Sequence, residues 1–327
     1  MRGMQQIRQV EDAREWNELV RSRGGHPLQL WGWGEVKAQH GWQVDRVVVE
    51  RDTVSIGLAQ LLIKRLPGPL RALVYVPRGP IVTEGEGEAF RDELSRYVKR
   101  RYRPVAVTVE PDSVGALSWK GWRRSANRIL LARTAVMDLE RSDDDLMAEM
   151  SKKTRQYIRK SAGEGLEVRL ANSLEEVDAC LAIYRHTAER AGFALHETQY
   201  YHDIFTALED DSPVYMATHE GRVVAFLWPI VTPEVAFELY GGMNDEGQRL
   251  RANYHLKWSV IRAMKARGVR RYDVNGLLND GVTTFKKGFI PEETQMSGTY
   301  DRPLSPLYAF WSILLPGAKR LLQRLRR

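Results

Sequence analysis

The sequence of 327 residues contains a single cysteine, Cys180, so an internal disulfide cannot stabilise the fold. Cys180 shares a helical stripe with Val177 and Leu181, which predicts a buried core thiol and not a nucleophile. No apolar run reaches the about 18 residues that a membrane span needs. The first residues, Met1 to Glu18, hold no apolar signal region. We therefore expect a cytoplasmic protein.

Several catalytic patterns are also missing. The seven histidines form no metalloprotease motif and no Cys-x-x-Cys pair occurs, so we expect no metal site. Neither a Walker loop nor a Gly-x-Ser-x-Gly elbow is present, which argues against P-loop enzymes and serine hydrolases. Acidic residues are the minority, 42 against 49 Lys and Arg, which gives a net charge of +7. This balance favours polyanionic partners such as tRNA, nucleotide diphosphates or an anionic membrane surface, and equally fits a solvated basic surface.

The order of predicted elements repeats within the chain. The first copy has a strand, a helix and a hairpin at Ile7–Val10, Glu11–Arg23, and Val44–Val49 with Val54–Ile63. The second copy has the same elements: a strand at Leu166–Leu170, a helix capped by Asn172 or Ser173 that runs to about Arg190, and a hairpin of Val214–His219 with Val223–Val231. This repeat predicts an α+β protein of two tandem domains that resemble GNAT (N-acetyltransferase) folds.

We expect the first domain to span residues 1–140, completed by 296–327, and the second to span 141–295. A long strand at Ile129–Leu139 is expected to lead out of the first domain. The amphipathic, basic tail Trp311–Arg327 is expected to pack on the first domain, with contact to the inner face of the membrane as an alternative.

Acetyltransferases of this fold bind the coenzyme A pyrophosphate in a glycine-containing loop before a helix. The corresponding segment of the second domain, Gln248–Asn253, lacks both glycines. In the first domain, Gly85–Glu88 carries carboxylates that would repel a phosphate. We therefore expect no coenzyme A cofactor, and an acyl donor of another kind.

Three segments carry residues suited to binding or catalysis. Ser151–Lys160 (SKKTRQYIRK) has five cations and no acid, and as a helix it suits either a phosphate backbone or a solvated surface. Leu30–Trp42 (LWGWGEVKAQHGW) sets Lys37 among tryptophans that could hold a sugar or base, although Trp31 and Trp33 also fit a core. Gly281–Phe289 (GVTTFKKGF) predicts a loop whose lysine could stabilise an oxyanion, or an exposed lysine pair.

These segments, in this order, resemble the Fem family of tRNA-dependent peptidoglycan peptidyltransferases, which includes FemA, FemB, FemX and MurM. Three further segments match the family pattern: HTAERAGF at His186–Phe193, the step Tyr240–Gly242, and Tyr272–Gly276. The resemblance implies transfer of an amino acid, with glycine, alanine or serine expected, from aminoacyl-tRNA. The acceptor it implies is the side-chain amine of the third stem residue of UDP-MurNAc-pentapeptide or lipid II. We expect a monomer.

The resemblance also implies a role for each matched residue. Lys286 and Phe285 would lie at the reaction centre, with Lys287 as the rival lysine. The expected substrate-binding residues are Lys37, Arg190, Tyr240, Trp33 and Asn275. Since the sequence offers no dedicated base, we expect a substrate group such as a stem carboxylate to assist proton removal.

The chain departs from the larger Fem members because it has no heptad pattern for their inserted helical hairpin. Contact with tRNA therefore falls to Lys152, Lys153, Arg155 and Arg159. Three alternatives stay open: a Fem-like enzyme acting on a small molecule or peptide antibiotic, a coenzyme A-dependent N-acyltransferase, and a non-catalytic nucleic-acid-binding or membrane-surface protein.

Overall fold

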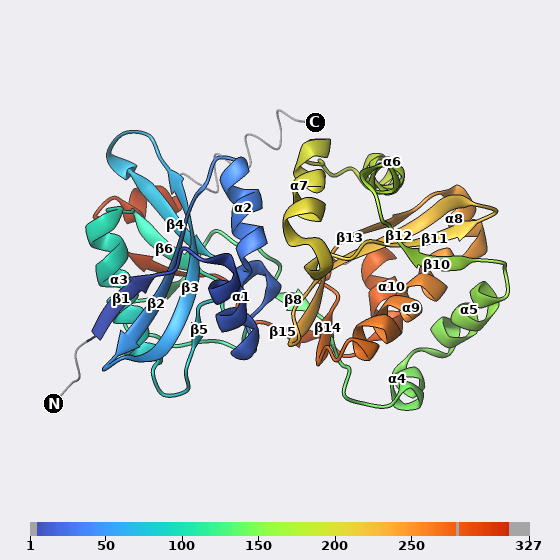
Figure 1. Ribbon diagram of the computed structural model, residues 1–327, viewed down its shortest axis with the longest axis horizontal. Helices are drawn as coiled ribbons and strands as arrows, with labels where there is room; N and C mark the ends of the chain where they lie inside the picture. Colours follow the sequence, from blue (N-terminus) through green and yellow to red (C-terminus); the bar gives the residue numbers. More distant parts are fainter. Residues whose placement is uncertain (1–4, 279–280, 314–327) are drawn as a thin grey trace. The chain divides into compact units, whose positions relative to one another are not determined.

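The computed structural model describes residues 5–278 and 281–313. The chain forms two compact units, Met1–Ala132 with Gln295–Arg327, and Arg133–Thr294 (Figure 1). The first boundary thus lies before Arg133 and not at the predicted residue 140. The reason is that the strand Val136–Asp138 pairs with the sheet of the second unit.

The first unit is built on one mixed sheet with α-helices packed against it. Its strands are β1 Gln5–Gln9, β2 Gln43–Arg51, β3 Val54–Arg65, β4 Ala72–Val76, β5 Ile81–Val82, β6 Ala106–Val109, β7 Arg123–Arg124 and β16 Tyr300–Pro303. Its helices are α1 Ala13–Ser22, α2 Trp31–Gln39 and α3 Gly87–Arg101. The strand order is β1-β2-β3-β4-β6-β16-β7, with β5 beside β3. Strands β4 and β6 are parallel and α3 connects them.

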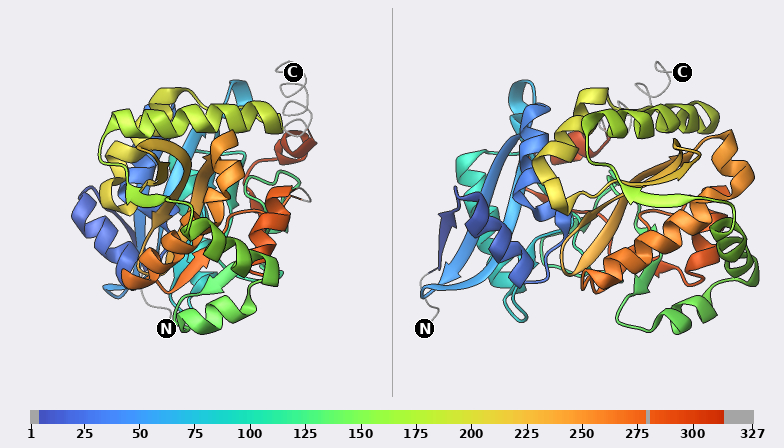
Figure 2. Two further views of the ribbon diagram at one scale, coloured as in Figure 1. Left: turned by 90° about the vertical axis from the view of Figure 1, so that its right-hand side faces the viewer. Right: turned by 45° about the vertical axis from the view of Figure 1, so that its right-hand side comes forward.

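The second unit contains a six-stranded sheet in the order β10-β11-β12-β13-β14-β9. Its strands are β8 Arg133–Thr134, β9 Val136–Asp138, β10 Glu167–Leu170, β11 Tyr215–His219, β12 Arg222–Val231, β13 Val235–Met243 and β14 Arg271–Asp273; β15 Thr294–Gln295 pairs with β8. Its helices are α4 Asp143–Glu149, α5 Lys152–Ala162, α6 Leu174–Ala191, α7 Thr198–Leu208, α8 Asp245–Leu250, α9 Ala252–Ala266 and α10 Gly281–Phe289. Helices α6 and α9 cover opposite faces of this sheet (Figure 2).

The two sheets follow one plan, which confirms the predicted repeat. In each, an antiparallel hairpin is followed by a third antiparallel strand, and a helical crossover then leads to a parallel strand. An antiparallel strand from a distant segment then extends each sheet, β16 beside β6 and β9 beside β14. The longest helix among the described residues is α6, with 18 residues, and no coiled-coil hairpin interrupts this order there.

Local chemistry explains where the elements begin and how they are held. The Asp12 carboxylate accepts the Glu15 N–H and caps α1. Trp16 on that helix is fully buried, and its indole donates to the Gln29 carbonyl at 2.7 Å. Ser173 caps α6 in the same way by accepting the Glu176 N–H. Cys180 on α6 is buried as predicted, and burial raises its thiol pKa to about 12.

Two sequence predictions of secondary structure are wrong. The segment Ile129–Leu139 is not one long strand, because the Glu110 carboxylate accepts the Ile129 and Leu130 N–H groups at 3.2 and 2.9 Å. Only the short strands β8 and β9 follow. The segment Gly281–Phe289 is helix α10 and not a loop, because its aromatic residues four apart, Phe285 and Phe289, pack together on one side.

The last described segment packs on the first unit. Tyr308 is buried with Val105 and Ala106, and Trp311 packs against them. Residues 314–327, which carry most of the basic tail and its proposed membrane contact, lie outside the described residues. Within the described part of the chain, no helix is both long enough and apolar enough to span a bilayer.

Candidate functional site

Helix α2 lies very close to the sheet of the first unit. A Cβ on Gly34 would come within 2.4 Å of both Gln60 Oε1 and Arg46 Nη2, so any larger residue here would displace these two buried side chains. Arg46 is buried and donates to the Gln60 amide oxygen at 2.8 Å. It also donates to the Trp31 carbonyl and the Glu35 carboxylate. These bonds fix the helix that carries Lys37.

Lys37 lies in the last turn of α2, one turn after Trp33. Its Nζ is 4.4 Å from the centroid of the Trp33 ring, a cation–π contact. Burial lowers the Lys37 pKa to about 8. Trp33 is 7% exposed, and its buried Nε1 has no hydrogen-bond partner among the described residues. An indole donor beside a half-buried cation suits a phosphate, carboxylate or carbonyl oxygen of a ligand.

In the second unit, β13 and β14 separate beyond a short parallel pairing. They pair only from Val235 to Phe237 on β13, which is nine residues long. A bulge against β12 follows, with Trp228 opposite Tyr240 and Pro229 opposite Glu238. The bulge sends Glu238 towards α9 and Tyr240 towards α6 and α7. The Glu238 carboxylate and the Tyr240 hydroxyl therefore belong to residues on either side of the point where the strands separate.

The lysine doublet on α10 divides into an inward and an outward residue. Lys286 is half-buried and donates to the carbonyls of Asn275 and Gly276 at 2.7 and 3.0 Å. Lys287 is 41% exposed and forms an ion pair with Glu293 at 2.8 Å. The neighbouring lysines thus have different environments, and only Lys286 points to the end of β14.

The two carbonyls that hold Lys286 belong to a left-handed turn after β14. Asn275 and Gly276 have φ values of 51° and 68°. The buried Asp273 carboxylate fixes this turn by accepting the Asn275 N–H at 2.8 Å, and it also accepts the Thr134 hydroxyl. Asparagine and glycine are the residues that adopt this conformation most readily. The turn therefore presents its carbonyls to a cation at a fixed place.

A buried ionic network that we did not predict lies next to the rings of Phe285 and Phe289. Lys257 on α9 is 2% exposed and pairs with Glu238, which also accepts the Tyr272 hydroxyl at 2.7 Å. The Lys257 ammonium lies 5.4 and 5.7 Å from the ring centroids of Phe285 and Phe289. Burial and the Glu238 charge raise the Tyr272 pKa, so this hydroxyl stays protonated as a donor. The network supports the aromatic side of α10.

Tyr240 lies in a separate aromatic cluster. Its ring centroid is 5.5 Å from Tyr184, 5.1 Å from Tyr201 and 5.7 Å from Trp228. Burial raises its pKa far above the usual value, so the hydroxyl is protonated. Tyr240 thus packs among aromatic rings of α6, α7 and β12, whereas Lys286 lies against the turn that follows β14.

The basic stretch forms helix α5, and its cations differ in environment. Lys152, Lys153 and Arg159 are exposed. Arg155 is half-buried and donates to the carbonyls of Ala148 and Met150, where α4 ends. The Arg155 guanidinium therefore satisfies the last carbonyls of a neighbouring helix, and its binding of tRNA stays a prediction.

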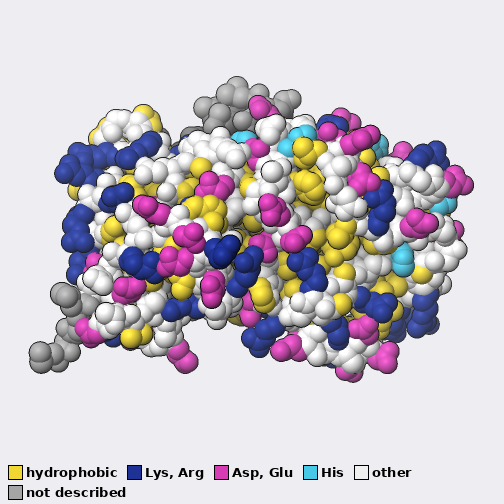
Figure 3. Space-filling model, in the orientation of Figure 1, with side chains coloured by type: hydrophobic (Ala, Val, Ile, Leu, Met, Phe, Trp, Pro, Cys, Tyr) yellow, Lys and Arg dark blue, Asp and Glu magenta, His cyan; other side chains and the backbone are white. Residues whose placement is uncertain are grey.

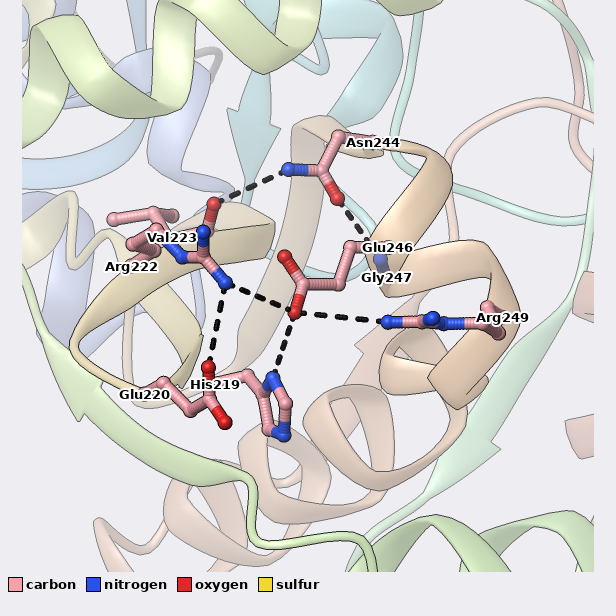
Figure 4. A network of polar contacts seen from close by, with 8 residues as sticks. All are labelled: His219, Glu220, Arg222, Val223, Asn244, Glu246, Gly247 and Arg249. Carbon is pink, nitrogen blue, oxygen red and sulfur yellow. Dashed lines mark hydrogen bonds and ion pairs between the residues drawn. The ribbon is translucent and has the colours of Figure 1, made fainter.

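A polar network joins α8 to the hairpin of β11 and β12 (Figure 4). The Glu246 carboxylate accepts from His219 at 2.7 Å and pairs with Arg222 and Arg249. The Asn244 side chain caps α8 through the Gly247 N–H. The chain then turns through a left-handed Arg251, with φ 54°, into α9. This corner is the place where an acetyltransferase would need its glycine loop.

The structure thus brings together Lys286, Phe285 and Asn275 in the second unit, and Lys37 with Trp33 in the first. The side chain of Arg190 lies outside the described residues, although its backbone belongs to α6. Sequence reasoning missed Lys257 and Glu238. A lysine within the buried apolar stripe of α9, beside Val260 and Ile261, is the signal that could have found them.

The repeated sheet plan defines a protein of two tandem GNAT-like domains. A tandem GNAT protein from the clavulanic acid pathway has a TM-score of 0.54 at 14% identity, covering 93% of this chain and 99% of that one. The crystal structure of FemX has a TM-score of 0.85 at 20% identity, covering 94% of this chain and 100% of that one.

The model of the FemAB family matches residues 14–118, 112–223 and 218–315, so the chain belongs to the FemAB family. A curated relative is the lipid II:glycine glycyltransferase of Staphylococcus aureus. It is 27% identical over 215 residues, which is 60% of this chain and 51% of the relative. The chain therefore spans about half the length of the curated relatives that it matches.

Proposed function

We propose that this protein transfers an amino acid from aminoacyl-tRNA to the side-chain amine of the third stem residue of a peptidoglycan precursor. Glycine, alanine and serine are the proposed amino acids, and the product would begin an interpeptide bridge. The observation that carries the proposal is Lys286, held by two carbonyls at the end of β14 with Phe285 beside it in sequence. Membership of the FemAB family supports the same reaction class.

The reaction exchanges one acyl bond for another. The acceptor amine attacks the ester carbonyl of the aminoacyl-tRNA, an N–C bond forms, and the C–O bond to the ribose breaks. The tRNA leaves with a free hydroxyl, and the amine loses a proton. Negative charge gathers on the carbonyl oxygen in between, so a cation fixed in advance lowers the barrier.

We assign that cation to Lys286. Because the Asn275 and Gly276 carbonyls already fix its ammonium, little reorganisation is needed when the oxyanion forms. Phe285 and the apolar side of α10 reduce the local dielectric and strengthen the attraction. Lys287 takes no part in this scheme, because it is engaged with Glu293 on the surface.

We assign acceptor binding to Lys37 and Trp33, whose cation and unpartnered indole N–H suit the phosphates or carboxylates of the precursor. Arg190, Tyr240 and Asn275 complete the proposed substrate-binding set. UDP-MurNAc-pentapeptide and lipid II are both proposed acceptors. Use of lipid II would place the reaction at the inner face of the membrane.

The test is to incubate the protein with total aminoacylated tRNA and each precursor form, then measure product mass. We expect a gain of one amino-acid residue on at least one precursor, and none when acetyl-coenzyme A replaces the tRNA. An acetyl mass gain would instead establish the coenzyme A-dependent alternative. No gain from either donor on either precursor would refute the proposed reaction.

A further inference from the structure

The hairpin that joins β3 to β4 ends in a tip without a polar side chain. The tip, residues 66–70, reads LPGPL, and both of its prolines are exposed. The Leu66 N–H donates to the Arg71 carbonyl at 2.8 Å, and the 3₁₀ turn Gly68–Leu70 closes the tip. Figure 3 shows hydrophobic side chains at this tip, at the upper left, with Lys and Arg side chains beside them. Because proline fixes φ, the tip is both apolar and already ordered.

The last described segment of the chain packs beside this tip. Residues 308–313 are helical, and the Tyr308 hydroxyl donates to the buried Asp301 of β16 at 2.8 Å. One apolar cluster joins this segment, the tip and the start of β6: Leu66, Leu70, Val105, Ala106, Leu307, Tyr308 and Trp311. Three segments that are distant in sequence therefore form one continuous surface.

The outer side of residues 308–313 is apolar and open to solvent. Phe310 and Ile313 are 59% and 76% exposed. They lie three residues apart in a helix, so their side chains project from the same side. An exposed apolar patch of this kind marks a site of interaction with a partner or a membrane. We name this patch the tip surface, and it consists of Leu66, Pro67, Pro69, Leu70, Phe310, Trp311 and Ile313.

Exposed arginines border the tip surface. Arg65 and Arg71 flank the tip, and Arg103 comes just before the start of β6. The Arg123 guanidinium lies 5.2 Å from the centroid of the Tyr308 ring. None of these four arginines forms an ion pair with a described residue. Their charge is therefore available to an anionic partner.

The segments around the tip surface carry no acid. Residues 64–71, 99–105, 114–124 and 302–313 contain lysine and arginine but neither aspartate nor glutamate. The sequence that follows, 314–327, continues this composition with leucines and further cations. Charge of one sign around an apolar patch favours a partner that is apolar within and anionic at its surface.

We infer that the tip surface docks on an anionic lipid bilayer. Its apolar side chains would lie in the interface, and the arginines would reach the headgroup phosphates while their stems cover apolar surface. The hairpin projects beyond its sheet in Figures 1 and 2, and a projecting tip suits a deformable lipid layer better than a rigid pocket. This inference goes beyond the proposed function, since a soluble precursor needs no bilayer.

The test uses the full-length protein and large vesicles, without tRNA or precursor. One set contains phosphatidylcholine alone, and the other adds about 30% phosphatidylglycerol. Sedimentation should show that the protein binds the anionic vesicles about tenfold or more tightly, and less tightly at about 0.5 M NaCl. Failure to bind anionic vesicles, or equal affinity for both sets, would overturn the inference.

A pair of exposed β-branched residues locates the contact. Ile313→Glu should weaken binding to anionic vesicles about fivefold or more, because it removes an apolar side chain and adds a repelled charge. Val54→Glu is the matched control: Val54 is 67% exposed, at the opposite end of β3 from the tip. An equal loss in Val54→Glu, or none in Ile313→Glu, would overturn the assignment to the tip surface.

A fluorescent label reports which residues enter the bilayer. Cys180 is the one cysteine of the chain, and burial raises its thiol pKa to about 12, so an introduced cysteine reacts selectively at neutral pH. With a polarity-sensitive label, Ile313→Cys and Pro69→Cys should shift emission to shorter wavelength on anionic vesicles, and Val54→Cys should not. A shift in Val54→Cys alone would place the contact elsewhere.

The arginines are tested by charge removal. Arg65→Gln with Arg71→Gln should remove most of the preference for anionic vesicles, since each cation near such a surface contributes about fivefold. Lys152→Gln with Lys153→Gln removes two exposed cations of the second unit and should leave the preference unchanged. The reverse result would move the anionic contact to α5 and overturn the inference.

These measurements are separate from the test of the proposed function. Vesicle binding without transfer to any precursor would leave the tip surface established and refute the proposed reaction. Transfer without vesicle binding would do the reverse. Self-association that Ile313→Glu abolishes, with no binding to vesicles, would assign the surface to a second copy of the chain and overturn the inference.

Discussion

The α2 region and the α10 region each hold a half-buried lysine, but by different means. Lys37 lies over the Trp33 ring, and burial lowers its pKa to about 8. Lys286 donates to two backbone carbonyls of a turn that Asp273 fixes. The first arrangement makes the charge sensitive to pH and to a bound anion. The second fixes the position of the cation.

This difference matches the two tasks that the proposed reaction sets. A lysine that binds an anionic precursor is useful when the bound anion stabilises its charged form. Stabilising a short-lived oxyanion requires a cation that is already in place. The comparison predicts that damage to the second unit alters stability and turnover, while damage to α2 alters affinity.

The largest effect is expected beneath α10. Lys257→Ala should lower the free energy of unfolding by about 3–5 kcal/mol, because it leaves the buried Glu238 carboxylate without its cation. The double variant Lys257→Met with Glu238→Leu should recover much of that loss. Chemical denaturation measures both. A single variant as stable as wild type would show that the pair does not support this region.

The packing of α10 on α5 offers the next test. A Cβ on Gly288 would lie 2.4 Å from Thr154 Oγ1, and Ser151 N–H bonds the Gly288 carbonyl at 2.9 Å. Gly288→Ala should therefore cost about 1–3 kcal/mol and reduce turnover by displacing Lys286. Adding Thr154→Ala removes the clash and should restore part of both. If the second substitution restored neither, the clash would not be the cause.

The α2 region predicts a pH effect on binding. Lys37 is charged below a pKa of about 8, so precursor affinity should fall above pH 8, by up to about tenfold per pH unit. The affinity stops falling above the pKa that Lys37 has in the complex, which is higher because the bound anion stabilises the ammonium. Lys37→Arg should give a flat profile between pH 7 and 10, because guanidinium keeps its charge. Calorimetric titration of the wild type would contradict the role if affinity stayed constant to pH 9.5.

The smallest effect concerns the Trp33 indole. Trp33→Phe keeps a ring beneath Lys37 but removes the unpartnered Nε1 donor. If that donor binds the precursor, affinity should fall by about 0.5–1.5 kcal/mol, with turnover at saturation unchanged. Trp42→Phe serves as the control. Equal precursor affinity in Trp33→Phe and wild type would exclude a bond from this indole.

Much of the fold could be predicted from the sequence, because local signals agree with it. Alternating apolar residues marked the hairpin of β2 and β3, and that of β11 and β12. A cap was predicted at Asn172 or Ser173, and Ser173 caps the start of α6. The long strand predicted at Ile129–Leu139 failed because Glu110, distant in sequence, binds its first N–H groups. Tertiary contacts of this kind leave no local pattern.

The site was only partly predictable for the same reason. The lysine doublet was visible, but the sequence could not show that Lys286 donates to the carbonyls of Asn275 and Gly276 whereas Lys287 pairs with Glu293. Arg155 belongs to a basic run in the sequence, yet it caps α4. Charge patterns predict that cations are present, whereas contacts from other elements decide what each one does.

The most direct test of the central claim is single-turnover transfer from labelled aminoacyl-tRNA to saturating precursor, measured for the wild type, Lys286→Ala and Lys287→Ala. We expect the transfer rate of Lys286→Ala to fall by about 10²–10³-fold, as for loss of an oxyanion donor, with precursor affinity retained. Lys287→Ala should stay within about threefold of wild type, since it loses only an exposed ion pair. Equal rates for Lys286→Ala and Lys287→Ala would contradict the claim that Lys286 lies at the reaction centre.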